Sequence, residues 1–343
     1  MYIVNSWYVA ATSEELKDKP LGRTICEQEI VFFRNSSGVV AAVEDFCPHR
    51  GLPLSLGKVE GDVLVCGYHG LCMGQSGETV SMPKQQVHNF PCNRTYPVIE
   101  KAGFIWVWPG DFEKANIDQL PELHWADNPD WAYGGGVYHV AADYRLMIDN
   151  LMDLSHENYV HSSSIGQKEI DEQPVHTKLE GDQVITSRFM ESVEAPPFWK
   201  MAMRQKGLDD NAIVDRWQIC RFQAPSQVMV DVGVALAGNG GFDADLSVKA
   251  YAVIVDFITP ETPDSHWYFW GLARTWGVAD SVMTSIIKEG QGEIFQEDMD
   301  ILERQQLSLS ANPKRRLLSL DIDAGGAMSR RLIQKHIKKE QTE

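Results

Sequence analysis

Cys47-Pro48-His49-Arg50-Gly51 and Cys66-Gly67-Tyr68-His69-Gly70 are the two stretches that decide the fold of the first third of this chain. Together they give the pattern C-x-H-x16-C-x2-H, in which each stretch supplies one cysteine, one histidine and a following glycine. Each comes directly after a short β-like run, residues 39–44 and 63–65. Two neighbouring loops of this kind can close on one cofactor from opposite sides.

Two thiolates and two imidazoles are the ligand set of a [2Fe–2S] cluster in which cysteine holds one iron and histidine the other. Glycines beside the ligands leave backbone N–H groups free to approach the cluster sulfurs. A tetrahedral zinc site uses the same residue types, and four unrelated loop residues are a second alternative. Because a zinc finger normally pairs cysteine with cysteine and histidine with histidine, the mixed pairs favour a cluster held by Cys47, His49, Cys66 and His69.

The residues around these loops alternate β-branched or aromatic runs with Gly-, Asn- and Ser-rich turns, which predicts a small β domain. Its last strand is expected over residues 103–108, followed by Pro109-Gly110 and an acidic, proline-containing connection over residues 111–129. We therefore predict an all-β domain over residues 1–110 and a second domain over residues 111–343.

The second domain is predicted to be α+β, a helix-grip-like antiparallel sheet with helices packed against it. Apolar residues at helical spacing predict a helix over 144–160, and Asp280-Ser281 is expected to cap a long helix running to about Ser308. A short terminal helix is expected over 328–339. Strands are expected over residues 217–222, 228–236, 248–258 and 267–275, with a turn at 259–264.

A second metal site is indicated by the segment Asp153-Leu154-Ser155-His156-Glu157-Asn158-Tyr159-Val160-His161. Two histidines and a carboxylate with open coordination positions form the facial triad of Fe(II) oxygenases. An interval of five residues separates two side chains on an ideal helix by too wide an angle, so we expect the helix to end or bulge between His156 and His161. The residues alone leave a plainer alternative, an amphipathic helix with two polar-face histidines.

Both motifs resemble those of the Rieske non-haem iron oxygenases, and the resemblance runs from Asn5-Ser6-Trp7-Tyr8-Val9-Ala10 to Asp323-Ala324-Gly325-Gly326. His156 and His161 stand in the D-x2-H-x4-H signature of this family. The family's third iron ligand is an aspartate on a late helix, which the resemblance places at Asp298. Three neighbouring carboxylates compete for that role: Glu293, Glu297 and Asp300.

The resemblance also implies an electron path between subunits. In the family, an aspartate at the position of Asp153 bridges a metal-ligating histidine to a cluster-ligating histidine of the neighbouring subunit. Asp153 would thus link His156 to His69 of another protomer, in a ring that is usually a trimer. The same resemblance places Asn150 near the iron.

The remaining cysteines are not expected to bind the cluster. Respiratory Rieske proteins typically carry two further cysteines, at positions that fall here on Leu52 and Tyr68, so the chain resembles the oxygenase branch. Six cysteines spread over a chain of 343 residues do not suggest a disulfide framework. Ordinary buried or partly buried thiols are expected at Cys26, Cys72, Cys92 and Cys220.

Within the family, the chain most resembles oxygenases that demethylate methoxybenzoic acids such as vanillate, through segments 44–51, 145–154 and 164–172. The implied reaction inserts one oxygen atom into a C–H bond of the aryl methoxy group, giving a phenol (protocatechuate from vanillate), formaldehyde and water. Electrons would come from NADH through a separate reductase bearing flavin and a plant-type ferredoxin centre. Halogenated methoxybenzoates and toluenesulfonates are alternative substrates. From other classes, a Rieske electron-transfer protein with a ligand-binding domain and a structural zinc protein remain open.

The walls of the substrate pocket are expected from the strands of 228–258 and the helix before Asp298. A carboxylate-bearing substrate needs a positive or hydrogen-bonding anchor, for which the candidates are Arg204, Arg216 and Arg221. Gly134-Gly135-Gly136 and Gly238-Asn239-Gly240-Gly241 lack the strand–turn–helix setting of a dinucleotide fingerprint, so both are interpreted as loops.

Charge and hydropathy limit the partners. Thirty-one Lys and Arg against 48 Asp and Glu give a net charge of −17, which opposes binding to nucleic acid or an anionic membrane surface. No apolar run approaches the ~18–20 residues of a membrane span, and the N-terminus lacks an export signal. We expect a cytoplasmic protein.

Overall fold

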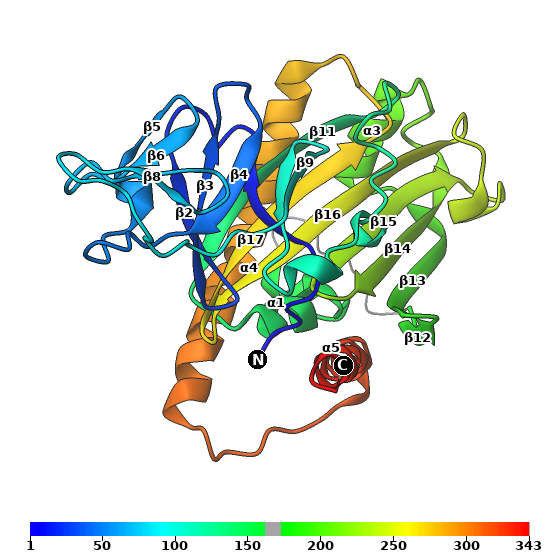
Figure 1. Cartoon of the computed structure of the whole chain (residues 1–343). Helices are drawn as coiled ribbons and strands as arrows, with labels where there is room; N and C mark the ends of the chain where they lie inside the picture. The colour runs from blue at the N-terminus through cyan, green and yellow to red at the C-terminus, as the bar shows by residue number, and fades with distance from the viewer. Residues whose placement is uncertain (162–172, 343) are drawn as a thin grey trace. The chain divides into compact units, whose positions relative to one another are not determined.

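The computed structural model describes residues 1–161 and 173–342 (Figure 1). The chain forms two compact units, Met1–Glu122 with Thr259–Pro263, and Leu123–Ile258 with Asp264–Glu343. The domain limits expected from the sequence, 1–110 and 111–343, stay a prediction. Segment 164–172, which carries part of the family resemblance, lies outside the described residues. Among the described helices, none is both long and apolar enough to cross a bilayer.

The first unit is built from three small antiparallel sheets. Their strand orders are β1-β10-β9, β2-β3-β4 and β5-β6-β7-β8. The expected last strand is confirmed as β10. The strands are β1 (Tyr8–Thr12), β2 (Leu21–Ile25), β3 (Gln28–Arg34), β4 (Val40–Glu44), β5 (Lys58–Glu60), β6 (Val63–Val65), β7 (Cys72–Met73), β8 (Thr79–Ser81), β9 (Val98–Lys101) and β10 (Phe104–Val107). Short 3₁₀ helices are η1 (Leu54–Leu56), η2 (Phe112–Lys114) and η3 (Ile117–Gln119).

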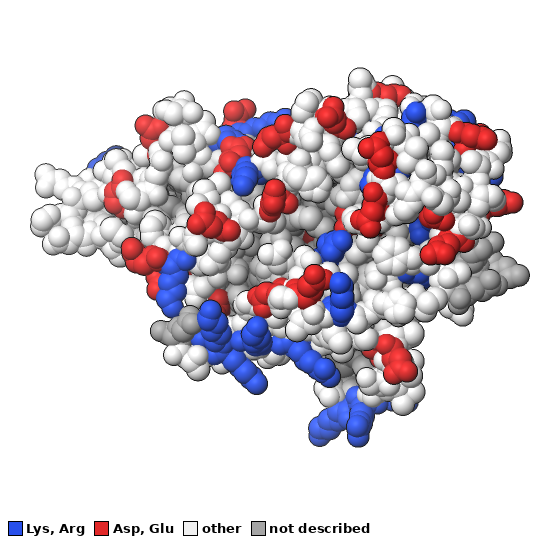
Figure 2. Space-filling model, turned by 90° about the vertical axis from the view of Figure 1, so that its right-hand side faces the viewer, with Lys and Arg blue, Asp and Glu red and all other residues white. Residues whose placement is uncertain are grey.

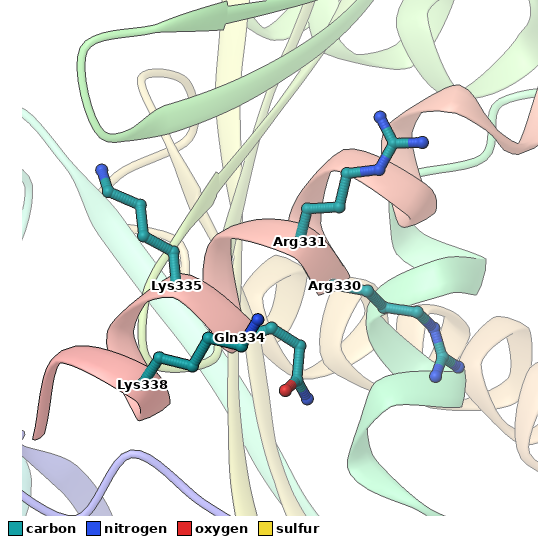
Figure 3. A pocket seen from close by; sticks show the side chains of 5 residues that line it. All are labelled: Arg330, Arg331, Gln334, Lys335 and Lys338. Atoms are coloured by element: carbon teal, nitrogen blue, oxygen red, sulfur yellow. The ribbon is translucent and has the colours of Figure 1, made fainter. Parts of the chain in front are cut away.

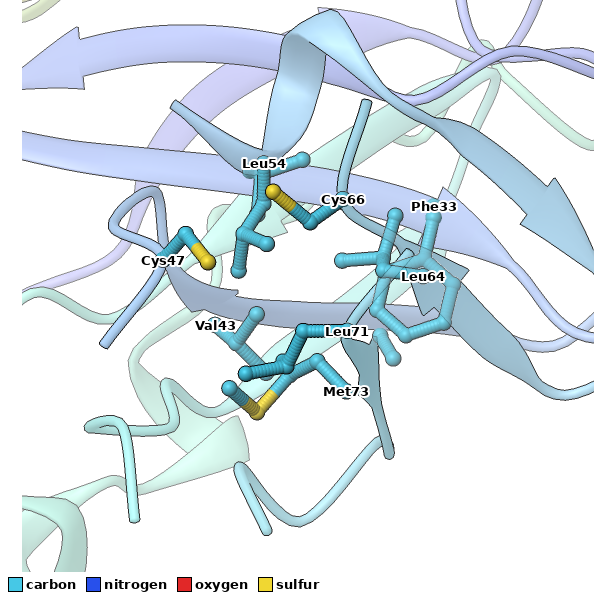
Figure 4. Packing of buried hydrophobic residues seen from close by; sticks show 10 residues of the cluster. Phe33, Val43, Cys47, Leu54, Leu64, Cys66, Leu71 and Met73 are labelled. Atoms are coloured by element: carbon cyan, nitrogen blue, oxygen red, sulfur yellow. The ribbon is translucent and has the colours of Figure 1, made fainter. Parts of the chain in front are cut away.

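The core of this unit includes the two motif cysteines. Figure 4 shows Cys47 and Cys66 among apolar side chains from the strands and from η1. The buried members of this cluster are Val31, Phe33, Ala41, Val43, Cys47, Leu54, Leu64, Cys66, Leu71 and Met73. Burial of these groups stabilises the strands that carry the two loops, which fixes where the loops begin.

The second unit is built on a seven-stranded sheet of order β11-β17-β16-β15-β14-β13-β12. Neighbouring strands from β12 to β16 pair antiparallel, and so do β11 and β17. The predicted α+β class is therefore confirmed. The strands are β11 (Ala132–Val140), β12 (His176–Glu180), β13 (Gln183–Glu194), β14 (Ile213–Gln223), β15 (Gln227–Leu236), β16 (Lys249–Thr262) and β17 (Ser265–Arg274).

The long helix α4 lies against β11 and β17 (Figure 1). Asp280 caps it as expected, because its side chain accepts a hydrogen bond from the N–H of Met283. Its buried residues recur at helical spacing: Ile287, Gly292, Phe295, Asp298, Met299, Leu302 and Gln306. The helices are α1 (Tyr144–Leu151), α2 (Glu157–Val160), α3 (Pro197–Gln205), α4 (Ser281–Ala311) and α5 (Ala324–Glu340), with 3₁₀ turns η5 (Gly241–Asp243) and η6 (Asp321–Asp323).

The interpretation of Gly134-Gly135-Gly136 as a loop was wrong, since these residues lie in β11 and pair with β17. A Cβ on Gly134 would lie 2.9 Å from the Thr284 side chain of α4, and one on Gly136 would lie 2.8 Å from the Trp270 ring. The glycines therefore let the helix and a tryptophan pack closely on the strand. Low side-chain volume was the requirement here, and it can be mistaken for turn chemistry.

Several expected limits also differ from the structure. The helix expected over 144–160 ends at Leu151, and a separate four-residue helix, α2, begins at Glu157. Strand β16 continues to Thr262, through most of the expected 259–264 turn. The terminal helix begins at Ala324 rather than at 328. Cys92, expected to be at least partly buried, is exposed.

Helix α5 is fastened by ion pairs and presents a basic face. Arg330 pairs with Asp149 of α1 through Nε at 2.8 Å, and Lys335 and His336 both pair with Asp182. Figure 3 shows the hollow lined by Arg330, Arg331, Gln334, Lys335 and Lys338. Acidic side chains, in contrast, are spread over the face shown in Figure 2 rather than gathered in one place.

Candidate functional site

The two Cys/His loops of the first unit have the same backbone hydrogen bonds. The N–H of Cys47 donates to the carbonyl of Leu52, and the N–H of Gly51 donates to the carbonyl of Cys47. The second loop repeats both bonds at Cys66, Gly70 and Leu71. Gly51 and Gly70 have φ of +70° and +73°, a conformation that a glycine adopts at no steric cost. The repeated C-to-G spacing in the sequence thus encodes two equivalent turns.

These loops bury the sulfur ligands and expose the nitrogen ligands. Cys47 and Cys66 are 2% and 3% exposed and carry no disulfide, whereas His49 and His69 are exposed, with ring centroids 4.6 Å apart. Burial raises the pKa of the Cys47 thiol, and the nearby Cys66 adds to the increase. The arrangement fits a [2Fe–2S] cluster whose cysteine-held iron is internal and whose histidine-held iron meets solvent.

The second unit brings His156, His161 and Asp298 together, as the sequence predicted. Their candidate ligand atoms all lie within 4.8 Å of one another. Among the described residues, no other group of three or more metal-binding side chains meets this criterion. Asp298 Oδ1 lies 3.5 Å from His156 Nε2 and 3.2 Å from His161 Nε2. Metal–ligand bonds of about 2.1 Å put adjacent ligand atoms about 3 Å apart, so the group is close to a metal-binding geometry.

The charges of this group also suit a cation. Burial alone would raise the pKa of Asp298, but its hydrogen bonds and charge interactions with His156 and His161 bring that pKa to about 2. Burial lowers the pKa of each histidine, yet the nearby carboxylates, Asp298 foremost, together outweigh it and the net pKa of both is raised. A carboxylate ionised at neutral pH and two imidazoles that can lose a proton form the donor set of a non-haem Fe(II) site.

The backbone between the histidines differs from the expected one. The helix was expected to end or bulge between His156 and His161, but it ends before both, at Leu151. His156 precedes α2 and His161 follows it, so a single helical turn separates the two imidazoles. Their ring centroids are 5.3 Å apart.

Asp298 and its neighbour Glu297 contact different nitrogen atoms of the His161 ring. Asp298 is 3% exposed within the buried stripe of α4 and accepts a hydrogen bond from Asn150 Nδ2 at 2.9 Å. Glu297 Oε2 lies 2.7 Å from His161 Nδ1, the ring nitrogen that faces away from Asp298. The sequence offered Glu297 only as a competing ligand, whereas its contact fits a partner that orients the imidazole. Glu293 and Asp300 are exposed.

Asp153 lies beside His156 but outside any helix. Its Oδ1 accepts the N–H of Ser155 at 2.7 Å, which fixes the turn, and its Oδ2 lies 4.0 Å from His156 Nδ1. That nitrogen is buried and has no hydrogen-bond partner among the described residues. A groove of about 620 Å³ is lined by Asn150, Asp153 and His156 together with residues of α4 and α5.

A buried ion pair holds the turn that precedes α2, and the sequence did not reveal it. Arg188 of β13 donates to Glu157 Oε1 at 2.9 Å and to the carbonyl of Leu154 at 2.8 Å. Gln218 of β14 donates to the same carboxylate at 2.8 Å. Arg188 and Glu157 are 1% and 4% exposed. Because Glu157 adjoins His156, this network positions the histidine; the only sequence signal was a glutamate inside an otherwise metal-binding motif.

The three arginines considered as substrate anchors have different surroundings. Arg204 is exposed and pairs with Asp210 at 2.7 Å, and Arg221 pairs with Asp231 at 2.6 Å. Arg216 is buried, on the same face of β14 as Gln218. Two of the three are therefore already engaged by carboxylates of the chain.

A Rieske-type loop pair in one unit and a 2-His-1-carboxylate group in the other define the class of Rieske non-haem iron oxygenases. Residues 6–92 match the Rieske [2Fe-2S] domain, and residues 140–339 match the family described as the vanillate O-demethylase oxygenase C-terminal domain. The chain belongs to this vanillate O-demethylase oxygenase family. It is a Rieske non-haem iron monooxygenase, its cofactors are a [2Fe–2S] cluster and a mononuclear iron, and it works with a separate reductase.

Individual relatives agree with this assignment. The chain is 61% identical to the vanillate O-demethylase oxygenase subunit of Pseudomonas sp. strain HR199 over 99% of its own length and 96% of the relative's. It is 34% identical to the oxygenase component of dicamba O-demethylase from Stenotrophomonas maltophilia over 91% of each chain. The crystal structure of dicamba monooxygenase bound to 3,6-dichlorosalicylic acid matches with a TM-score of 0.89 at 31% identity, over 100% of this chain and 99% of that one.

Proposed function

We propose that the chain removes the methyl group of vanillate as the oxygenase component of a vanillate O-demethylase. The observation that supports vanillate as the substrate is the 61% identity to a vanillate O-demethylase oxygenase subunit along nearly the whole chain. The reaction consumes the aryl methyl ether, O₂, NADH and a proton, and yields protocatechuate, formaldehyde, water and NAD⁺. The non-haem iron, when bound, supplies the activation of O₂ that this chemistry requires.

In this proposal each metal has named ligands. Cys47, Cys66, His49 and His69 hold the [2Fe–2S] cluster, supported by the buried thiols and paired exposed imidazoles. His156, His161 and Asp298 hold the iron, supported by their mutual distances.

Neighbouring side chains orient the iron ligands. Asn150 donates to Asp298, and Glu297 contacts the second nitrogen of His161. These residues keep the imidazoles and the carboxylate in one geometry before substrate arrives.

In this proposal, electrons pass from the [2Fe–2S] cluster of one subunit to the iron of a neighbouring subunit. Asp153 links His156 to His69 of a neighbouring protomer in a ring, usually a trimer. The supporting observation is that Asp153 and His156 line the same groove. The reductase carries flavin and a plant-type ferredoxin centre and takes its electrons from NADH in the cytoplasm.

The first experiment is a metal analysis of purified protein combined with a turnover assay. Close to three iron and two acid-labile sulfide per chain are expected, with a red-brown colour. With reductase, NADH and vanillate, protocatechuate and formaldehyde should appear in equal amounts. Zinc in place of iron, or two iron per chain without turnover, would contradict the proposal.

Substrate controls separate the proposal from its nearest alternatives. Relatives 33% and 34% identical to this chain are described as toluene-4-sulfonate and dicamba oxygenases. Turnover of either compound with no turnover of vanillate would retain the class of enzyme and reject the substrate.

A further inference from the structure

Asp256 is a buried carboxyl group with one unused oxygen. It lies on β16, is 0% exposed, and its Oδ1 accepts a hydrogen bond from the Tyr268 hydroxyl at 2.7 Å. Its Oδ2 has no hydrogen-bond partner among the described residues. Leaving a buried carboxyl oxygen unpaired costs folding free energy, so such an atom in a natural protein points to a missing partner.

The neighbouring strand contains a matched pair in which both oxygens are used. Asp231 of β15 also accepts a hydrogen bond from a tyrosine hydroxyl, that of Tyr251. Its second oxygen accepts the Nε of Arg221 at 2.6 Å. The sheet therefore holds two Asp–Tyr pairs, and only Asp231 has both carboxyl oxygens paired by described residues.

The Asp256 side chain lies on the sheet face that α4 covers, because it bonds the hydroxyl of Tyr268, whose ring contacts this helix. The ring of Tyr268 packs edge-on against Phe295, with centroids 5.3 Å apart, and Phe295 is one helical turn before Asp298. Burial raises the pKa of Asp256 to about 8, the Tyr268 hydrogen bond opposes this, and the charge of Asp298 adds to it.

Two neighbours of Asp256 on this face are apolar. Val228 lies directly opposite it in the register of β15, and Phe222 lies opposite Val228 on β14. Directly opposed residues of antiparallel strands have their side chains on the same face of the sheet. Val228 and Phe222 are both 0% exposed. Apolar side chains beside an unpaired polar atom suit an aromatic ring that bears one polar substituent.

We infer that Asp256 binds a hydroxyl group of the aromatic substrate and thereby orients the ring. A hydroxyl group both donates and accepts hydrogen bonds, so it pairs with the carboxyl group whether that group is ionised or neutral. A substrate carboxylate would be repelled by the ionised form. The inference rests on the proposed function. Vanillate has a hydroxyl next to its methoxy group, so a hydrogen bond to the hydroxyl fixes the position of the methyl group.

The test compares vanillate with 3-methoxybenzoate, which lacks the hydroxyl, in the holoenzyme with its reductase. The readouts are the ratio of the two kcat/KM values and the ratio of the two dissociation constants, the latter by anaerobic calorimetry without reductase. Wild-type protein should favour vanillate by roughly 10-fold or more, because a site built to hydrogen-bond a hydroxyl rejects the analogue lacking it. Asp256→Val should bring both ratios close to one.

Two further variants keep the comparison sharp. Asp256→Asn retains a group that can hydrogen-bond the hydroxyl, so its ratios should fall between those of wild type and Asp256→Val. Asp231→Asn alters the matched pair, whose oxygens are both occupied, and should leave the ratios unchanged even if stability falls. Because each ratio is measured within one protein sample, a general loss of folded enzyme cancels.

The outcomes distinguish this inference from the proposed function. Equal kcat/KM values for the two compounds in wild type, or an unchanged ratio in Asp256→Val, would overturn the role of Asp256 while demethylation stands. Absence of turnover and binding of both compounds in wild type would overturn both, because the inference rests on methoxybenzoates being substrates.

Discussion

Glu297 Oε2 lies 2.7 Å from Nδ1 of His161, so that the imidazole is held from the side opposite Asp298. An acidic partner at the outer nitrogen of a metal-binding histidine fixes the tautomer that leaves Nε2 free to bind the metal. Two consecutive residues of α4 therefore have different roles, one facing the metal position and one facing the ring behind it.

Replacing Glu297 with glutamine should weaken iron binding without removing a ligand. The loss of the carboxylate should lower iron affinity or turnover by about 10- to 100-fold. Iron retained against a graded chelator series measures the effect. Glu293→Gln, one turn earlier and exposed, is the matched control and should retain iron like wild type. Equal retention in the two variants would show that Glu297 does not support His161.

Replacing Asp153 with asparagine should separate the metal sites from electron transfer. Asp153 is not proposed as a ligand, so cluster and iron content should stay at wild-type levels. Turnover coupled to NADH should nearly vanish if Asp153 bridges His156 to the neighbouring protomer. The control is Asp149→Asn, because Asp149 lies four residues earlier in the chain and pairs with Arg330 instead. Retained coupled turnover in Asp153→Asn would reject the bridge but not the family assignment.

Replacing Arg188 with methionine should destabilise the protein and disturb His156. Removing one partner of a buried ion pair leaves the other charge unpaired and costs about 3–5 kcal/mol of unfolding free energy. The double variant Arg188→Met with Glu157→Gln should recover part of this loss, because no buried charge is then left. Denaturant midpoints and iron content measure both effects. The exposed pair Arg204–Asp210 is the comparison, where Arg204→Ala should cost about 0–1 kcal/mol.

The stabilisation that iron gives should increase with pH. Burial lowers the pKa of His156 and His161, but the nearby carboxylates, Asp298 foremost, raise it by more. Without metal, both imidazoles therefore stay protonated above their ordinary pKa near 6.5. Their pairing with Asp298 stabilises the metal-free protein below that pH and is lost as pH rises through the raised pKa. Iron binds only neutral imidazole, so protons compete with it at low pH.

The measurement is the difference in Tm between iron-loaded and metal-free protein under anaerobic conditions. This difference should be larger at about pH 8 than at about pH 6. Asp298→Asn removes a proposed iron ligand, so its Tm should be nearly the same with and without iron at both pH values. A difference in Tm that does not change with pH would contradict the proposed role of the two histidines.

Local sequence patterns allowed much of the fold and of the candidate sites to be predicted. The C-x-H and C-x2-H stretches specify two turns whose hydrogen bonds join residues four or five apart, so the local chain fixes their geometry. The cap at Asp280 and the buried stripe of α4 follow from local hydrogen bonding and helical periodicity. Prediction was wrong where packing set the requirement: the glycines of β11 make room for Thr284 and Trp270, which lie more than 130 residues away in the sequence.

The sequence by itself determined the family, the four candidate cluster ligands, the two histidines of the iron site and the α+β class, because each depends on local motifs or on the periodicity of apolar residues. Only the tertiary structure decided which carboxylate of α4 faces the histidines, since Glu297 and Asp298 are adjacent and differ only in the direction that packing of the helix gives them. It also revealed the contact of Arg188 with Glu157 and the unpaired oxygen of Asp256. Those features arise when segments distant in sequence are brought together, which no local pattern encodes.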